Sequence, residues 1–333
     1  MKILLRAVLL LALLGACTNA APAQESAEQM IDSLMAAYDE ASDDAAKLAV
    51  CEDVLQKYPE SNYTVPLLGL AKEHSVELGA LAEFVQFAEQ IRSRVSSQET
   101  LDDIDRFMLE TYGEAKQLDK LNTLAGRLTK DTEGDFNLYY DLAKAYADVE
   151  QWDAVLDYAE RARPFATPEA YKNDYPDREM SDEVLEQRAR NREGLIHTYA
   201  GWAKAQTGQF DAALDEFADA DERTDRLYMG HTYGNLDYFW GQTLAMAGKT
   251  DQAIGRLAPR AIFGEDDETM AALRDVYIKK NGSEDGFDSF IESMRTKLAR
   301  PVDDFTLKGY SGEELTLSSF NGKVILLSFW FPT

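Results

Sequence analysis

The sequence predicts a mostly α-helical repeat protein with a short β segment near its C-terminus. From about Ser26 to Ala299, apolar residues recur at i, i+3 and i+4, which is the spacing of an amphipathic helix. Similar helix-turn-helix segments recur along the same region, as in stacked repeat proteins. After Ala299 the spacing changes to alternation, with glycine-containing turns between short apolar runs.

Residues 1–16 are expected to be an export signal. Lys2 and Arg6 give a positive start, and the apolar run Ile3 to Leu14 is shorter than the roughly 20 residues that span a bilayer. The segment ends Leu14-Gly15-Ala16-Cys17, which resembles a bacterial lipoprotein signal. This resemblance implies cleavage before Cys17 and lipidation of its thiol. The alternative is an ordinary signal peptide with a chance cysteine.

The resemblance also implies a location. Thr18, rather than Asp, follows Cys17, and in diderm lipoproteins this favours the outer membrane. We therefore expect a lipid anchor in the cell envelope, a tether over residues 17–25 and a body that faces the periplasm.

The composition excludes several kinds of site. The chain has 60 acidic and 34 basic residues, for a net charge of −26, which argues against binding nucleic acid phosphates. The three histidines are far apart in sequence and predict no metal site, and we expect no cofactor. Cys51, in an expected helix Asp44 to Lys57, is interpreted as a core residue. With Cys17 lipidated, no intramolecular disulfide framework remains.

The clearest helical unit runs from Thr198 to Ala220. Gly201 is a small residue in the first helix, Gly208 stands at the turn and Phe210 begins the second helix. Ala213, Phe217 and Ala220 form a small-large-small face on that second helix. This unit resembles a tetratricopeptide repeat (TPR). The resemblance implies a solenoid over residues 26–299, in which stacked helix pairs bury a continuous core and leave a concave groove for a protein partner.

Other units are more divergent. One copy has Gly241 and Gly248 at the matching positions, and another has Glu150 where the turn glycine would stand. Earlier pairs are expected at Ala27 to Leu55, Val65 to Val95 and Leu101 to Leu128, for about six pairs in all. The alternative is an irregular α-bundle with repeat-like patches.

Two further segments are candidate contact sites. The proline-containing loop Arg163 to Ser181 is expected to be an extended excursion that packs on the edge of the solenoid through its tyrosines. An aromatic cluster stands before Gly241 and consists of Tyr228, Tyr233, Tyr238, Phe239 and Trp240. We propose a partner groove lined by Tyr199, Trp202, Tyr238 and Trp240. These aromatic residues could equally form the interior of one helix pair.

Residues 300–333 predict a hairpin followed by a buried strand, Val324 to Phe331. The motifs Pro301-Val302-Asp303-Asp304-Phe305-Thr306-Leu307 and Phe320-Asn321-Gly322-Lys323 are similar to the opening of a thioredoxin-like (redoxin) domain. The resemblance implies an α/β domain whose Cys-x-x-Cys motif would follow this strand. No catalytic residue can be assigned, and Trp330, Phe331, Pro332 and Thr333 would lie at the rim of the redox site.

Two functions therefore stay open. In the first, the full-length protein is a thiol–disulfide oxidoreductase that acts on protein disulfides or peroxides, with the solenoid as its partner-binding region. The chain as printed would then lack activity, because it ends where a cysteine or selenocysteine is expected. A selenocysteine codon, a fragment boundary and gene decay would all give the same string. In the second, the protein is a non-catalytic scaffold lipoprotein of the cell envelope.

Overall fold

The computed structural model describes residues 35–130, 134–226, 232, 234–264, 266–299, 302–309 and 311–325. The prediction of a mostly helical chain is confirmed. After a helical stretch at residues 35–40, the α-helices are α3 (Asp44–Lys57), α4 (Thr64–Glu77), α5 (Leu81–Arg94), α6 (Gln98–Glu114), α7 (Leu118–Leu128), α8 (Phe136–Asp148), α9 (Trp152–Ala162), α10 (Pro168–Asp174), α11 (Asp182–Gln206), α12 (Phe210–Arg223), α13 (Leu236–Met246), α14 (Thr250–Phe263), α15 (Asp267–Asn281) and α16 (Phe287–Leu298).

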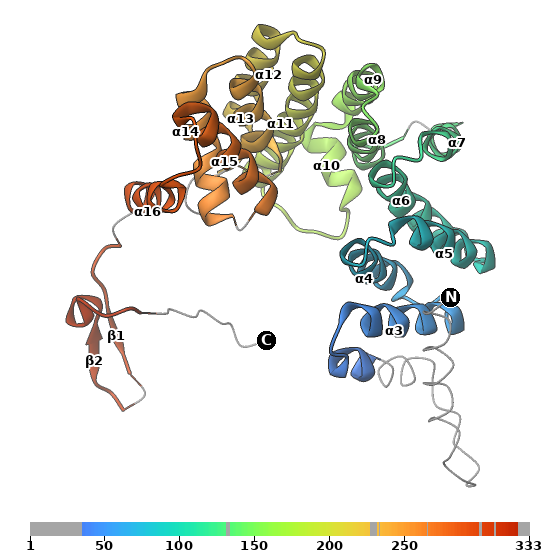
Figure 1. Ribbon diagram of the computed structural model, residues 1–333. Helices are drawn as coiled ribbons and strands as arrows, with labels where there is room; N and C mark the ends of the chain where they lie inside the picture. The colour runs from blue at the N-terminus through green and yellow to red at the C-terminus, as the bar shows by residue number, and fades with distance from the viewer. Residues whose placement is uncertain are drawn as a thin grey trace.

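The helices stack as pairs in which each pair packs on its neighbours in sequence. Figure 1 shows an arch with α4, α6, α8, α11, α13 and α15 along its inner side, here called the inner helices. The outer helices α5, α7, α9, α12, α14 and α16 lie on its outer side. Each inner helix also contacts the inner helix of the next pair. Nearest-neighbour packing of this kind is the arrangement of a helical repeat array.

Five of the turns between an inner and an outer helix have the same backbone geometry. The residue at each turn has a left-handed φ: Gly79 (65°), Lys116 (56°), Glu150 (59°), Gly208 (80°) and Gly248 (74°). Its N–H donates to the carbonyl three residues earlier, and the following N–H donates to the carbonyl five residues before itself, at distances of 2.7–3.2 Å. This pair of bonds is the Schellman motif, which satisfies carbonyls at the end of a helix.

Two of the turns lack the residue that this geometry favours. A left-handed φ suits glycine, because a Cβ atom is crowded there. Lys116 and Glu150 adopt it nevertheless. The prediction that Glu150 stands at the turn position of its unit is confirmed.

Small residues allow the helices of a pair to approach closely. A Cβ atom at Gly201 would lie 2.9 Å from the ring of Phe217, and one at Gly241 would overlap the side chain of Leu257. The close approach expected at Gly201 is therefore present, and the next unit repeats it. At Gly113 of α6, a Cβ atom would lie 2.9 Å from the backbone of Ala145 in α8, so two inner helices are also in close contact.

Buried apolar side chains form two clusters. The larger one extends from α3 to α13, and the second extends from α13 to α16. Cys51 is fully buried in the larger cluster, and burial raises the pKa of its thiol to about 11. Its interpretation as a core residue is confirmed.

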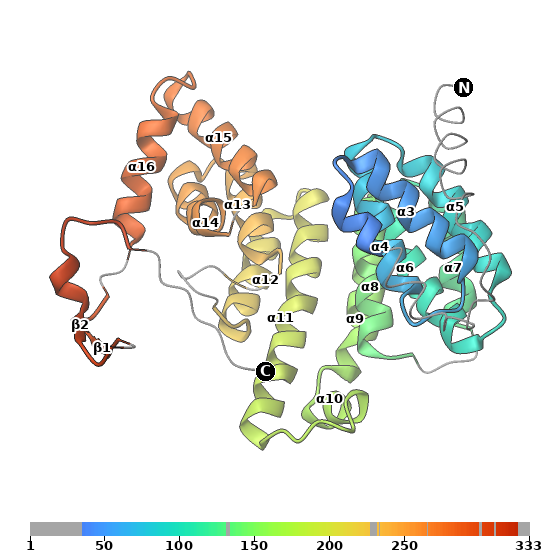
Figure 2. The same ribbon diagram turned by 90° about the horizontal axis from the view of Figure 1, so that it is seen from below.

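The segment from Arg163 to Ser181 is more ordered than we expected. It contains a 3₁₀ turn, Arg163–Phe165, and the helix α10. Pro168 stands in the first turn of α10, where its missing N–H costs no hydrogen bond, and Thr167 caps the helix by accepting from the N–H of Ala170. The prediction of an extended excursion is therefore wrong. Figure 2 shows α10 beside the N-terminal end of the long helix α11.

The same segment packs on the array through a tyrosine, as predicted. The guanidinium of Arg192 in α11 lies 4.6 Å from the ring of Tyr171 and 4.6 Å from that of Phe136. It also donates to Asp174 at 2.5 Å. Only 4% of Arg192 is exposed, so this buried cation fixes α10 to α11.

The hairpin expected near the C-terminus is present. Strands β1 (Thr306–Lys308) and β2 (Glu314–Thr316) are antiparallel, with Leu307 opposite Leu315. Leu307 and Leu315 are 56% and 41% exposed, and the hairpin extends beyond α16 in Figure 1. Val324 and Ile325, at the start of the expected buried strand, are in no strand and are exposed. The rest of that strand lies outside the described residues.

Candidate interaction surface

Aromatic side chains connect three neighbouring inner helices. The ring of Tyr140 in α8 meets Tyr199 in α11 edge-on at 5.5 Å, and Tyr199 meets Phe239 in α13 edge-on at 5.5 Å. Trp202 stacks on Phe239 at 4.5 Å with an interplanar angle of 5°, and Tyr238 lies 5.7 Å from Phe239. We call these five residues the aromatic ladder. Tyr140, Trp202 and Tyr238 are half-buried, whereas Tyr199 and Phe239 are buried.

The positions of the ladder residues follow from the helical repeat. Tyr199 precedes the turn residue Gly208 by as many residues as Phe239 precedes Gly248. Equivalent positions on successive inner helices lie side by side, so an aromatic residue repeated in register forms a continuous row. The ladder reaches the next inner helix through the hydroxyl of Tyr238, which donates to Glu268 of α15 at 2.9 Å.

The structure brings together three of the four residues proposed for the partner groove. Tyr199, Trp202 and Tyr238 all belong to the ladder. Trp240 lies elsewhere: its ring stacks on Phe217 of α12 at 6.1 Å, and the guanidinium of Arg256 in α14 lies 3.7 Å from its centroid. Successive helical residues point in directions about 100° apart, so neighbours in sequence face different surroundings.

Sequence reasoning missed one member of the ladder, Tyr140, whereas Phe239 belongs to the aromatic cluster expected before Gly241. The signal that could have found Tyr140 is its distance from the turn. Tyr140 precedes Glu150 by as many residues as Tyr238 precedes Gly248. Because Glu150 replaces glycine, this register is harder to recognise in the α8–α9 unit.

The row that contains Tyr199 and Phe239 has an acidic residue at its α8 position, Asp141. Burial raises its pKa to about 6, although Lys144 and Arg106 oppose the shift. Asp148, at the end of α8, behaves similarly: burial raises its pKa to about 6 against the effect of Lys116. The inner side therefore carries carboxylates that are poorly solvated near the ladder.

Towards the N-terminus, the inner helices present paired charges. Lys72 of α4 contacts Glu114 of α6 at 2.9 Å and Glu110 at 3.7 Å. Lys144 of α8 lies 3.9 Å from the second carboxylate oxygen of Glu110. The inner side is thus mixed in charge over α4, α6 and α8, and aromatic over α8, α11 and α13.

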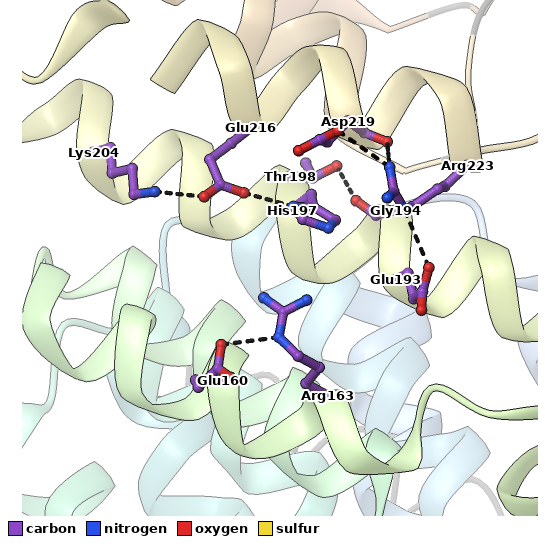
Figure 3. Close-up of polar contacts among 10 residues, drawn as sticks. All are labelled: Glu160, Arg163, Glu193, Gly194, His197, Thr198, Lys204, Glu216, Asp219 and Arg223. Carbon is purple, nitrogen blue, oxygen red and sulfur yellow. Dashed lines mark hydrogen bonds and ion pairs between the residues drawn. The ribbon is translucent and has the colours of Figure 1, made fainter. Parts of the chain in front are cut away.

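A second polar group joins α11 to α12 (Figure 3). The carboxylate of Glu216 accepts hydrogen bonds from Nδ1 of His197 at 2.6 Å and from Nζ of Lys204 at 2.5 Å. Burial disfavours ionisation of Glu216, but these two hydrogen bonds outweigh it and lower its pKa to about 2. Because an ionised carboxylate can only accept, Nδ1 of His197 carries a proton. Both oxygens of Glu216 are occupied, so this group fixes one helix pair rather than presenting a free base.

Nearby contacts in Figure 3 are also structural. Arg223 of α12 pairs with Glu193 of α11 at 3.1 Å, and Thr198 donates to the carbonyl of Gly194 at 2.7 Å. Arg163 pairs with Glu160 within its own segment. Of these contacts, the Arg223–Glu193 pair joins α11 to α12.

Within the described residues, no group of three or more His, Cys, Asp or Glu side chains is placed to hold a metal ion. In the same residues, no helix combines the length and apolar character needed to cross a membrane. Cys17 and the expected redox rim, Trp330, Phe331, Pro332 and Thr333, lie outside the described residues.

No protein-family model and no curated protein matches the chain. A tetratricopeptide repeat protein from Parabacteroides merdae, known from a crystal structure, aligns with 82% of this chain and 98% of its own, at 14% identity and a TM-score of 0.43. A likeness at this level does not support a shared fold or function.

Proposed function

We propose that this protein is an interaction scaffold whose inner helices hold a segment of a partner protein. The observation that supports it is the aromatic ladder, in which Tyr140, Trp202 and Tyr238 remain partly exposed on three adjacent helices. Large rigid aromatic side chains supply much of the binding energy at protein interfaces. A row of them on the inner side of an arch suits an extended or helical segment better than a small molecule.

We further propose that the array is of the TPR type. Five equivalent left-handed turns and the packing of Gly201 on Phe217 and of Gly241 near Leu257 support this assignment. The inner helices of such an array form its concave side, which places the ladder where a partner segment would bind.

Site-specific photo-crosslinking in the host cell tests the scaffold proposal. A photoreactive residue would replace Gln242, whose amide donates to Tyr238 at 3.4 Å, or Ala218, which is exposed on α12. We expect a discrete protein adduct from position 242 and none from position 218. Addition of Trp202→Ala should reduce the adduct several-fold. Absence of an adduct at 242, or an equal adduct at 218, would contradict the proposal.

A thiol–disulfide oxidoreductase is a second proposal, and the β1–β2 hairpin favours it. The pairing of Leu307 with Leu315 matches the hairpin that the redoxin resemblance implies, and its exposed leucines suit packing against further chain. Under this proposal, the gene continues in frame past the codon for Thr333 and encodes a Cys-x-x-Cys or selenocysteine-x-x-Cys motif. Sequencing that region tests it, and a reading frame without such a motif would leave only the scaffold.

We also propose the lipid anchor at Cys17 in the outer membrane, with the array in the periplasm. The observation behind it is the sequence Leu14-Gly15-Ala16-Cys17. Mass spectrometry of the mature N-terminal peptide tests it directly. We expect a diacylglyceryl-cysteine with an acylated amine, and an unmodified N-terminus at another residue would exclude the anchor.

A further inference from the structure

A groove of about 540 Å³ lies at the edge of the array where the inner–outer turns gather. It is bounded by α7, by the turn from α8 to α9, by the first two turns of α9 and by the turn after α11. Its lining consists of Leu118, Asn122, Tyr146, Glu150, Gln151, Trp152, Asp153, Ala154, Asp157, Tyr158 and Thr207. None of these residues belongs to the aromatic ladder.

Aromatic rings form one wall of the groove. Tyr146 and Tyr158 stack at 5.3 Å with an interplanar angle of 21°, and the hydroxyl of Tyr146 donates to Asn122 at 2.7 Å. Burial raises the pKa of Tyr146 to about 12, so its hydroxyl stays neutral at physiological pH. Trp152, at the start of α9, is half-buried beside them. This wall is therefore fixed in place and partly open.

The charge on the rim has one sign. Glu150, Asp153 and Asp157 are exposed, and no lysine, arginine or histidine is among the described residues that line the groove. Asp157 has an ion pair with Arg161 at 3.8 Å, in which the Arg161 and Asp157 side chains are 37% and 65% exposed, and solvent-exposed pairs of this kind contribute little. The guanidinium of Arg161 also lies 5.1 Å from the centroid of the Tyr158 ring, outside the lining of the groove. The inner side differs, because Lys72 and Lys144 there face Glu110.

Another part of the fold shows what a tryptophan beside two aspartates binds. Arg256 lies over the ring of Trp240 at 3.7 Å, and its Nη1 atom is 3.0 Å from Asp221 and 3.1 Å from Asp237. One tryptophan and two aspartates thus bind a guanidinium within the fold. The groove carries the same set, Trp152 with Asp153 and Asp157, and its lining contains no arginine.

We propose that this groove binds an arginine side chain presented by an extended segment of another protein. The guanidinium would stack on Trp152 and pair with Asp153 and Asp157. An arginine fits better than a lysine, because its planar group both stacks on aromatic rings and forms two-point bonds to carboxylates. The net charge of −26 favours approach of a basic segment. This groove is separate from the aromatic ladder, so it would provide a second contact with a partner in addition to the one proposed for the inner helices.

The test uses a defined probe, the peptide acetyl-Arg-Gly-Arg-amide, and the indole N–H signal of Trp152 in NMR spectra of the whole chain. The signal is assigned by its loss in Trp152→Phe. The ligand control is the same peptide with citrulline, which keeps the shape of arginine and removes its charge. We expect saturable shifts of the Trp152 signal with the arginine peptide and at least tenfold weaker binding of the citrulline peptide.

A matched pair of protein variants separates the site from general charge. Asp153→Asn with Asp157→Asn removes two carboxylates from α9. Asp211→Asn with Asp215→Asn removes two from the corresponding positions of α12, which do not line the groove. We expect at least tenfold weaker binding in the first double variant and unchanged binding in the second.

Three results would overturn the proposal: no saturable shift of Trp152, equal binding of the citrulline peptide, or equal loss of binding in both double variants. Equal circular dichroism and melting temperature in the two double variants would show that both are folded. Because Trp202 does not line the groove, Trp202→Ala should leave the binding of the arginine peptide unchanged.

Discussion

The pairs α6/α7 and α11/α12 have the same turn but opposite distributions of side-chain size. In α11/α12 the inner helix has Gly201, and the outer helix has Phe217 against it. At the positions the same number of residues from the turn, α6 has Leu109 and α7 has Ala125, both buried. The large residue has moved from the outer helix to the inner one.

Four of the five units with the common turn have one large and one small residue at these positions. The inner and outer residues at these positions are Lys72 with Ala88, Leu109 with Ala125, Ala143 with Ala159, Gly201 with Phe217 and Gly241 with Leu257. The α8/α9 unit has two alanines, and none of the five units has two large residues there. Interiors are close-packed, so this contact does not accommodate two large residues, but either helix can supply the large one. A repeat can therefore keep its geometry after its sequence signature has inverted.

The largest expected effect is loss of the large residue in the α11/α12 unit. Phe217 is fully buried against Gly201, and Phe217→Ala removes a ring from a site that glycine cannot fill. We expect the free energy of unfolding to fall by about 3–5 kcal/mol in urea denaturation followed by circular dichroism. Ala125→Gly, at the same position of α7, should cost only about 1 kcal/mol. Similar losses from both substitutions would break the comparison.

The buried acid in the row of the ladder should make stability depend on pH. Burial raises the pKa of Asp141 from 3.8 to about 6, so folding favours its protonated form. Its contribution is therefore most favourable below about pH 4 and is lost as the pH rises through 6. We expect Asp141→Asn to stabilise the protein at pH 7.5 by about 1–3 kcal/mol and to have little effect at pH 4.

Denaturant melts at the two pH values check this, with Asp215→Asn on the exposed side of α12 as the control. A pH-independent effect of Asp141→Asn would show that burial does not disfavour the charge of Asp141.

The smallest expected effects concern the turns. Glu150→Gly removes a Cβ atom from a residue with a left-handed φ and should raise the free energy of unfolding by about 0.5–1 kcal/mol. Gly208→Ala places one in the same conformation and should lower it by about 1 kcal/mol. A Cβ atom at Gly208 would have no neighbour within 4 Å, so the cost of Gly208→Ala would come from the backbone conformation and not from a clash. Equal signs for the two substitutions would contradict the equivalence of the turns.

Local patterns predicted much of the fold. The expected helix Asp44 to Lys57 has the same bounds as α3, and the hairpin forms where alternation and glycine indicated it. Helix α10 was not predicted, because prolines inside a segment usually break a helix, whereas Pro168 stands in the first turn and needs no N–H. The pair α15/α16 was missed as a unit, since its two left-handed glycines, Gly282 and Gly286, do not match the spacing of the other turns.

The candidate site was only partly predictable. Aromatic content pointed to α11 and α13, but a list of aromatic residues does not say which rings meet. Trp240 follows Phe239 directly and faces Phe217 and Arg256 instead of the ladder. The groove beside Trp152 was not foreseen, because it joins residues from α7, α9 and the turn after α11. Such sites depend on packing between units rather than on the pattern within one.

The most direct test of the inverted packing is a double-mutant cycle that converts α11/α12 to the arrangement of α6/α7. Gly201→Leu alone should be strongly destabilising, because even a Cβ atom would lie 2.9 Å from the ring of Phe217. Combined with Phe217→Ala, it should recover stability, with a coupling free energy of about 1–3 kcal/mol. Additive losses in the double variant would show that the two positions do not share one volume, and would contradict a common register for the five units.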